Sequence, residues 1–230
     1  MELLKPENHE EIPSKSPEHS LPVIVVGAGG HARVLIEMLG RSGVEIIGLV
    51  DPAHRIGKSI SGVPVIGDDS VIDNYSSSDV RLVNGIGALP GQIKRISIAE
   101  NFRSKGYQFS TVIDPNACIA SDVEISDGVQ VMPGVIIQPG VRIGQDTILN
   151  TGVNVDHDCQ IGSNVHIAPG STLSGNVIVR DGGHIGTGTT VIQAIEIGAN
   201  SIIGAGCVIL SDVKENQKIV QKKDNSVTPI

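Results

Sequence analysis

The chain is poor in aromatic residues, in positive charge and in long apolar runs. Its 230 residues include 28 glycines but no tryptophan, with only 2 tyrosines and 2 phenylalanines, so small aliphatic side chains must fill the interior. Its 17 basic and 25 acidic residues give a net charge of −8, which argues against nucleic acid or an anionic membrane surface as the main partner. No stretch approaches the roughly 20 apolar residues of a membrane helix.

Cysteine pairs and a secretory leader are lacking as well. Cys118, Cys159 and Cys207 are widely spaced without a C-x-x-C pair, which favours a reduced, cytoplasmic setting over a disulfide framework or a cysteine zinc site. Residues 1–20 have no apolar core of the kind that signal peptides carry, and their polar composition predicts a disordered tail.

The chain contains a repeat with a period of six residues. Every sixth residue from Ile113 to Ile209 is Ile, Leu or Val, and a second series of mostly small residues runs at the same period from Ala117 to Val213. One aliphatic and one small inward residue per six predict a short strand and a turn, and three such strands form one triangular coil. Coils stack at the spacing of sheet strands, roughly 4.8 Å. We therefore expect a parallel β-helix of about five coils over residues 109–213, followed by a tail over 214–230.

Residues 21–108 predict a separate, Rossmann-like unit. An apolar strand over 22–27 precedes a glycine turn, a helix over 32–39 and a second strand that ends before Asp51, which is the order of a βαβ unit. Gly27, Gly29 and Ala32 fit G-x-G-x-x-A, whose backbone N–H groups can hold a phosphate at the start of a helix. Glycines in such turns also serve simply to pack strand against helix, and that alternative stays open.

The rest of this unit is short. A strand near 80–85 and a helix near 91–105 complete it, with Gly85 and Gly87 forming a second glycine-rich edge. The unit is half of a full dinucleotide fold, so a mononucleotide-type ligand such as a nucleotide-sugar fits better than NAD.

The repeat over residues 113–213 resembles the hexapeptide repeat of left-handed β-helix acyltransferases. That resemblance implies a homotrimer with acyl-CoA bound between neighbouring prisms. It does not determine the reaction, because related β-helices include zinc carbonic anhydrases. Zinc would need three ligands around one point, whereas only His166 and His184 are spaced to stack one coil apart, so no metal site is expected.

His157 is the candidate general base. Acyl transfer from a thioester needs a base with a near-neutral pKa, and the adjacent carboxylate of Asp158 would raise the basicity of the imidazole. The alternative is a solvated turn histidine. Cys159 falls in the inward series of small residues and is expected in the core, which favours direct transfer without an acyl-enzyme.

The two halves together resemble the sialic acid/nucleotide-sugar O- and N-acetyltransferase family, which includes UDP-4-amino-sugar and perosamine N-acetyltransferases. The resemblance spans residues 22–213 and rests on GAGGHA followed by N-x6-H-[DE]-C-x-I-G. By position it implies His157 as catalytic base, Asp158 as its acidic partner and Asn150 as a polar neighbour. It implies acetyl-CoA contacts from His166, Gly175 (whose N–H would be the oxyanion donor), Thr187 and Ala205. It implies nucleotide-sugar contacts from Gly29, Gly30, His31, Asp51 and Gly87.

Relatives in that family usually close with a G-x-P-A-K segment, which the residues after 213 lack. Phosphate contacts to the coenzyme could come instead from lysines, although a solvated tail is the simpler expectation; the lysines are Lys214, Lys218, Lys222 and Lys223.

The sequence thus favours a cytoplasmic, metal-independent N-acetyltransferase that uses acetyl-CoA as co-substrate and a UDP- or GDP-linked amino-sugar as acceptor. One alternative is O-acetylation of sialic acid or a related sugar. Another is a non-catalytic nucleotide-sugar-binding protein. An NAD-dependent oxidoreductase is disfavoured because the second mononucleotide half is lacking.

Overall fold

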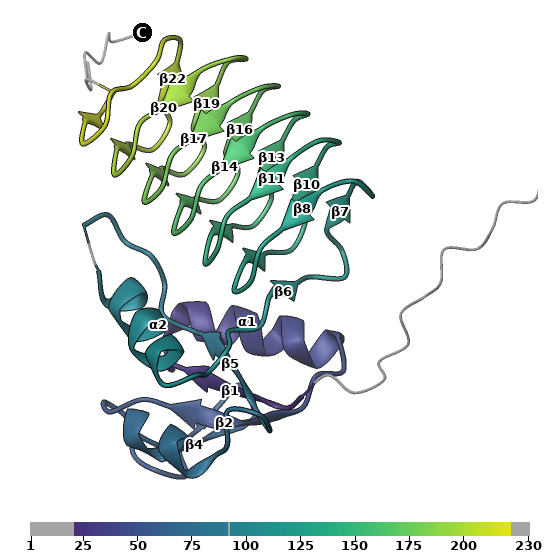
Figure 1. The fold of residues 1–230 in the computed structure, drawn as a ribbon, viewed down its shortest axis with the longest axis vertical. Coiled ribbons are helices and arrows are strands. Elements are labelled where there is room, and N and C mark those ends of the chain that lie inside the picture. The colour runs from purple at the N-terminus through teal and green to yellow at the C-terminus, as the bar shows by residue number, and fades with distance from the viewer. Residues whose placement is uncertain (1–20, 92, 222–230) are drawn as a thin grey trace, which may run out of the picture.

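A computed structural model describes residues 21–91 and 93–221, in which an α/β unit adjoins a triangular prism of parallel strands (Figure 1). The predicted disordered tail over 1–20 lies outside these residues, as do Lys222 and Lys223. Within the described ranges, no helix has both the length and the apolar character needed to cross a membrane.

Three parallel sheets of two-residue strands form the faces of the prism. The seven-stranded sheet contains β6 (Val112–Ile113), β9 (Gln130–Val131), β12 (Ile148–Leu149), β15 (His166–Ile167), β18 (His184–Ile185), β21 (Ile202–Ile203) and β23 (Lys218–Ile219). The six-stranded sheet contains β7 (Cys118–Ile119), β10 (Ile136–Ile137), β13 (Asn154–Val155), β16 (Thr172–Leu173), β19 (Thr190–Val191) and β22 (Val208–Ile209). The five-stranded sheet contains β8 (Glu124–Ile125), β11 (Arg142–Ile143), β14 (Gln160–Ile161), β17 (Ile178–Val179) and β20 (Glu196–Ile197). The predicted left-handed parallel β-helix is confirmed.

The expected end of the prism at residue 213 is wrong. Strand β23 pairs in parallel with β21, so the prism continues to Ile219, and Lys214 and Lys218 belong to its last coil instead of to a tail. Strand β23 begins earlier in the sequence than the repeat predicts. Ile203 pairs with Ile219, whereas an unbroken period would pair it with Gln221. This local shortening hid the last strand from the periodic pattern.

Columns of aliphatic side chains fill the prism. Val131, Leu149, Ile167 and Ile185 from the seven-stranded sheet are fully buried above one another. Burying each such side chain stabilises the fold by roughly 1.5–3 kcal/mol. Regular stacking therefore supplies the core that the missing aromatic residues would otherwise provide.

The second inward series of the repeat includes small polar residues whose hydrogen bonds are satisfied. The Thr147 hydroxyl donates to the Gly162 carbonyl at 2.7 Å, and the Ser171 hydroxyl donates to the Gly186 carbonyl at 2.9 Å. Cys159 belongs to the same series at another corner of the prism, is fully buried, and lies 3.2 Å from the Ser174 carbonyl. Burial raises the pKa of its thiol to about 11. Cys159 is thus a core residue, as predicted, and is not a thiolate near neutral pH.

Gly186 lies where two coils touch through their backbones. A Cβ at this position would come within 2.5 Å of the Ala205 nitrogen and 2.6 Å of the Gly204 carbonyl carbon. We expect Gly186→Ala to lower the free energy of unfolding by about 2–3 kcal/mol, because backbone atoms cannot move aside as a side chain can. Thermal unfolding measures this. The control is Gly40→Ala in a helix, where no atom lies within 4 Å and the melting temperature should not fall. Equal melting temperatures for both variants would contradict the close contact between coils.

The α/β unit is larger than the predicted βαβ arrangement. Its sheet has the order β3-β4-β2-β1-β5. Its elements are β1 (Val23–Val26), α1 (Gly30–Arg41), β2 (Ile46–Val50), β3 (Ser59–Ile60), β4 (Val63–Gly67), the 3-10 helix η1 (Asp69–Asn74), β5 (Arg81–Asn84) and α2 (Lys94–Ser104). The elements β3, β4 and η1 were not predicted, because Gly57, Gly62 and Pro64 give this segment the composition of a loop.

Helix α1 packs between this sheet and the prism, whereas η1 and α2 cover the opposite face of the sheet. Arg41 of α1 donates to Asp114 at 2.6 Å, and Nη2 of Arg103 in α2 donates to Oδ1 of Asp146 at 2.9 Å. Both carboxylates are almost fully buried and belong to the first coils of the prism. These pairs fix the position of the α/β unit relative to the prism.

Candidate active site

His157 lies on the turn between β13 and β14. Its Nδ1 is 2.8 Å from Oδ2 of Asp158. Since a carboxylate only accepts hydrogen bonds, Nδ1 carries the proton and Nε2 presents a lone pair. The hydrogen bond to Asp158 raises the pKa of His157, and the imidazole side chain is 54% exposed. The geometry therefore gives an accessible base with its free nitrogen already in the correct tautomer.

Gly175 lies beside this imidazole, one coil further along the prism. A Cβ at position 175 would come within 2.5 Å of His157 Nε2, so a glycine is what leaves room for the ring. Among the hydrogen bonds of the described chain, the Gly175 N–H donates none, whereas the next N–H, that of Asn176, donates to the His157 carbonyl at 2.9 Å. A free N–H donor thus adjoins a free base nitrogen, which is what stabilising an oxyanion beside a proton acceptor requires.

His166 is a different kind of histidine. Its Nε2 lies 3.2 Å from the amide nitrogen of Asn150, and its ring stacks edge-on against His184 with centroids 4.9 Å apart, which confirms the predicted stacking. Burial, followed by the neighbouring His184, His31 and Arg95, lowers the pKa of His166 to about 3. It is neutral near pH 7 and a weak base, which favours His157 as the proton acceptor. The described residues contain no group of three His, Cys, Asp or Glu side chains placed to hold a metal ion.

The predicted prism residues separate into two groups. The amide of Asn150, predicted as a polar neighbour of the site, contacts His166. Asn150, Thr187 and Ala205 lie on turns that join the seven-stranded to the six-stranded sheet, whereas His157 and Gly175 lie on turns that join the six-stranded to the five-stranded sheet. The two groups therefore occupy opposite edges of the six-stranded sheet, and one chain does not bring them together.

The glycine turn of the α/β unit opens into a cavity of about 200 Å³ at the carboxyl ends of β1, β2 and β5. Gly29 caps α1 without a side-chain hydrogen bond, and Gly30 begins the helix with its backbone exposed. Asp51, at the end of β2, accepts from the N–H groups of Ala28 at 2.9 Å and Ala53 at 2.8 Å. Burial opposes ionisation of Asp51, but these hydrogen bonds together with that of His54 outweigh it and lower the pKa. An ionised carboxylate thus borders the glycine turn.

His31 connects the two parts of the chain. Its Nε2 lies 2.7 Å from Oε1 of Gln130, whose amide in turn donates to the Asn84 carbonyl at 2.9 Å. Burial lowers the pKa of His31 to about 4, so the ring is neutral. Gly87 lies next to the His31 side chain, since a Cβ at position 87 would lie 3.5 Å from the His31 Cβ. The contacts of His31 and Gly87 with a nucleotide-sugar stay predictions.

Sequence reasoning missed two residues of this cavity. Asp69, at the start of η1, and Lys94, at the start of α2, both line it. Burial raises the pKa of Asp69, and the charge of Lys94 opposes that shift. Lys94 could have been found from its position, because a basic residue in the first turn of a helix opposes the helix dipole and suggests an anionic neighbour. Asp69 carried no such signal, since η1 itself was not predicted.

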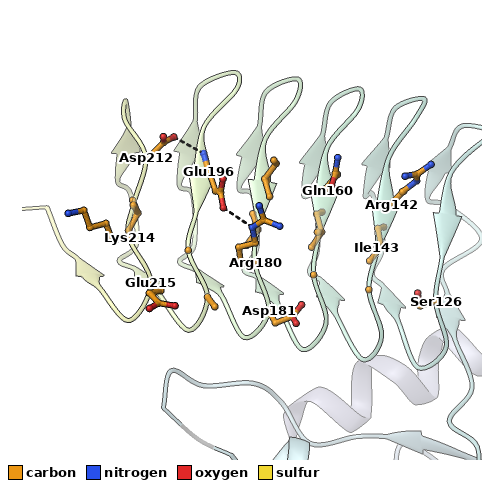
Figure 2. A pocket seen from close by; sticks show the side chains of 18 of the residues that line it. Ser126, Arg142, Ile143, Gln160, Arg180, Asp181, Glu196, Asp212, Lys214 and Glu215 are labelled. Carbon is orange, nitrogen blue, oxygen red and sulfur yellow. Dashed lines mark hydrogen bonds and ion pairs between the residues drawn. The ribbon is translucent and has the colours of Figure 1, made fainter.

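A groove of about 900 Å³, larger than the cavity at the glycine turn, is not where this chemistry lies. It follows the five-stranded sheet (Figure 2) and contains ion pairs such as Arg180–Glu196 at 2.7 Å. The Glu196 N–H also donates to Asp212 at 2.8 Å. The predicted catalytic and nucleotide-binding residues lie outside the set that lines this groove, as do the coenzyme contacts implied by position. Lys214, considered above for a phosphate contact, is the exception and lines the groove. The placement of donors and acceptors, and not the size of the cavity, identifies the candidate site.

Comparisons with known proteins agree with this geometry. Residues 22–102 match the family model of the PglD N-terminal domain, and residues 140–175 match the bacterial transferase hexapeptide model of six repeats. No curated protein sequence matches the chain.

Solved structures resemble the whole described chain. A histidine-to-alanine mutant of GDP-perosamine N-acetyltransferase from Caulobacter crescentus, in complex with CoA and GDP-perosamine, is 34% identical with a TM-score of 0.80, over 87% of this chain and 95% of that one. The acetyltransferase domain of PglB from Neisseria gonorrhoeae, in complex with acetyl coenzyme A, is 32% identical with a TM-score of 0.79, over 87% and 96%. WeeI from Acinetobacter baumannii, at 23% identity and a TM-score of 0.78 over 88% and 97%, shares the fold.

Proposed function

The chain belongs to the hexapeptide-repeat family of nucleotide-sugar N-acetyltransferases, and we propose on this premise that it transfers acetyl from acetyl-CoA to the amino group of a nucleotide-linked amino-sugar. One observation carries the proposal: the free Nε2 of His157 adjoins the free N–H of Gly175, on a prism joined to an α/β unit with a glycine turn. The GDP-perosamine and acetyl coenzyme A complexes of similar structures support the choice of both substrates.

The proposed reaction is direct transfer in a ternary complex. Nε2 of His157 takes a proton from the sugar amine as its nitrogen attacks the thioester carbonyl. The Gly175 N–H stabilises the oxyanion, and collapse of the intermediate releases CoA as a thiolate, which recovers the proton. Cys159 takes no part, because its thiol is buried with a raised pKa. We also place the enzyme in the cytoplasm, where acetyl-CoA and nucleotide-sugars are made.

An acceptor panel tests this function. Purified protein is incubated with acetyl-CoA and with UDP- and GDP-linked 4-amino-sugars, and the release of free CoA thiol is followed. Matched acceptors carry a hydroxyl in place of the amine, and free sialic acid is a further acceptor. Turnover restricted to the amino-sugars supports the proposal. Turnover of the hydroxyl acceptors or sialic acid would favour O-acetylation, and nucleotide-sugar binding without turnover would favour a non-catalytic role.

We propose further that the active enzyme is a homotrimer in which the six-stranded sheets face a threefold axis. The outward residues of this sheet carry no charge: Cys118, Ile136, Asn154, Thr172, Thr190 and Val208. In such an arrangement, the edge with Asn150 in one chain lies next to the edge with His157 in its neighbour. This contact would unite the two groups of site residues that a single chain keeps apart.

A charge on that face should dissociate the trimer. Thr172→Arg places a guanidinium on the six-stranded sheet, where threefold symmetry would bring three like charges together. We expect mainly monomer by light scattering at micromolar concentration, with activity lost. Gln160→Arg, on the exposed face of the five-stranded sheet, is the control and should stay trimeric. A wild-type mass near the 24.0 kDa of one chain would contradict the trimer itself.

Asp51 should affect the acceptor and not the coenzyme. We expect Asp51→Ala to raise the KM for the nucleotide-sugar about tenfold, because a carboxylate at the end of this strand can accept hydrogen bonds from a ribose or a base. The KM for acetyl-CoA should change little. Steady-state kinetics with each substrate varied in turn measures both, with Asp79→Ala as an exposed carboxylate control. A parallel rise in both constants would overturn the assignment of this cavity.

A further inference from the structure

A second cavity lies between the α/β unit and the prism. It has a volume of about 180 Å³ and is separate from the glycine turn. The segment from Ala88 to Gly91 and the first turn of α2 form one wall, and His166 and His184 of the seven-stranded sheet form another. In Figure 1, the segment that leads from β5 to α2 rises towards the prism. The proton transfer and oxyanion stabilisation proposed above use His157 and Gly175, and neither residue lines this cavity.

Arg95 lines the cavity and is only 4% exposed. Its Nη1 donates to the carbonyls of Asn84 at 2.9 Å and Ile86 at 2.7 Å. Its Nε and Nη2 are buried and have no hydrogen-bond partner among the described residues. Burial lowers the pKa of Arg95 to about 10, which leaves it charged near pH 7. A buried cation with two unsatisfied donors is unfavourable unless a further group completes its hydrogen bonds.

The described neighbours do not supply that group. Asp146 lines the same cavity, but its two oxygens accept from Nη1 and Nη2 of Arg103. His166 is neutral, and the first turn of α2 has no acidic residue. The surroundings of Arg95 therefore offer one positive charge that no available negative charge neutralises.

The two unpaired N–H donors of Arg95 indicate which kind of ligand the cavity can bind. Nε and Nη2 form one of the two forks of a guanidinium, and parallel N–H donors at that spacing match the two oxygens of a carboxylate or a phosphate. The bonds from Nη1 hold the guanidinium in place in advance, so little entropy is lost on binding.

We propose that this cavity binds one oxyanion, a carboxylate or a phosphate group, held by Nε and Nη2 of Arg95 at the seam between the α/β unit and the prism. The site does not rest on the proposed function: Arg95 is its binding residue, and of the predicted site residues His166 alone, an expected acetyl-CoA contact, lines the cavity. The oxyanion contacts both parts of the chain and stabilises their docking.

Binding of inorganic phosphate tests the proposal. Wild-type protein is titrated by calorimetry and melted with phosphate or with chloride at equal ionic strength. We expect saturable binding and a higher melting temperature with phosphate alone. Arg95→Lys keeps the charge without the fork and should raise the dissociation constant at least tenfold. Arg142→Lys makes the same exchange at an exposed residue of the five-stranded sheet, outside both cavities, and should bind phosphate as the wild type does. Equal binding by Arg95→Lys and the wild type would overturn the site.

A measurement on the wild type avoids variants that disturb folding. Crystals soaked in selenate should show anomalous density within hydrogen-bond distance of Nε and Nη2. Density for water alone, or a carboxylate of a second copy of the chain on this fork, would overturn the proposal.

Competition identifies the source of the oxyanion. UDP, GDP and CoA are each added to the phosphate-loaded protein, and also to phosphate-loaded Arg95→Lys so that displacement from the glycine turn can be subtracted. Displacement by a nucleotide or by CoA would assign the site to a phosphate of that compound, and retention of phosphate would assign it to a free small anion. Each result supports the site and names its occupant. Acetyl transfer is assayed separately, so failure of this site and failure of the proposed function are distinguishable.

Discussion

Replacing His157 with alanine is expected to lower kcat by roughly 10²–10⁴-fold while the oligomer and the melting temperature are retained. The amine reacts only after it loses a proton, and the variant lacks the acceptor. The imidazole is largely exposed, so its removal leaves no cavity in the core. Steady-state kinetics, with thermal unfolding as the folding control, measures both. An unchanged kcat would end the general-base proposal.

The pH dependence of kcat distinguishes a catalytic base at His157 from one at His166. The raised pKa of His157 places the acidic limb of the rate profile above the ordinary histidine value of 6.5, because the protonated ring cannot accept the amine proton. Asp158→Asn removes the carboxylate that raises this pKa, so the limb should move to lower pH, with a smaller loss of kcat. Asn tolerates the left-handed backbone of this residue, whose φ is 59°, so the turn is preserved. His166→Ala should mainly raise the KM for acetyl-CoA and leave the limb in place.

The second large effect is expected for Gly175→Ala. Its Cβ would overlap the His157 ring at 2.5 Å, and the ring, being exposed, would move away instead of the backbone. A displacement of about 1 Å at the reacting atoms can reduce the rate about 10²-fold. We therefore expect kcat to fall by about this factor, without the loss of stability expected for Gly186→Ala.

Gly40→Ala is the matched control for this variant, since it adds the same methyl group where no atom lies within 4 Å. A crystal structure of Gly175→Ala should show the imidazole rotated away from position 175. Wild-type kcat in this variant, or a melting temperature as low as that of Gly186→Ala, would contradict the predicted contact between Gly175 and His157.

The local periodic patterns determined most of the fold. A side chain that points inward every six residues allows one kind of stacking, so the prism and the column that contains Leu149 and Ile167 follow from spacing alone. The pairing of His166 with His184 follows for the same reason. The turn from Gly27 to Gly29 likewise predicted the crevice, because a glycine turn between strand and helix is a local structure.

Local patterns could not show contacts between segments far apart in the chain. His31 bonds to Gln130, and Arg95 is buried beside Asp146, because of how the α/β unit docks on the first coils. The position of β23 also depends on packing, since a single shortened coil does not produce a repeat that the sequence pattern could reveal.

In the candidate site, too, some contacts follow from the sequence and others depend on tertiary packing. Adjacent residues such as His157 and Asp158 could be paired from the sequence, because one turn holds both. The placement of Asn150 with His166, at the opposite edge of a sheet from His157, was decided by the winding of the prism. Spacing along the chain determines which residues share a column. Which column faces another part of the molecule depends on tertiary packing, because that packing selects among surfaces that the repeat makes nearly alike.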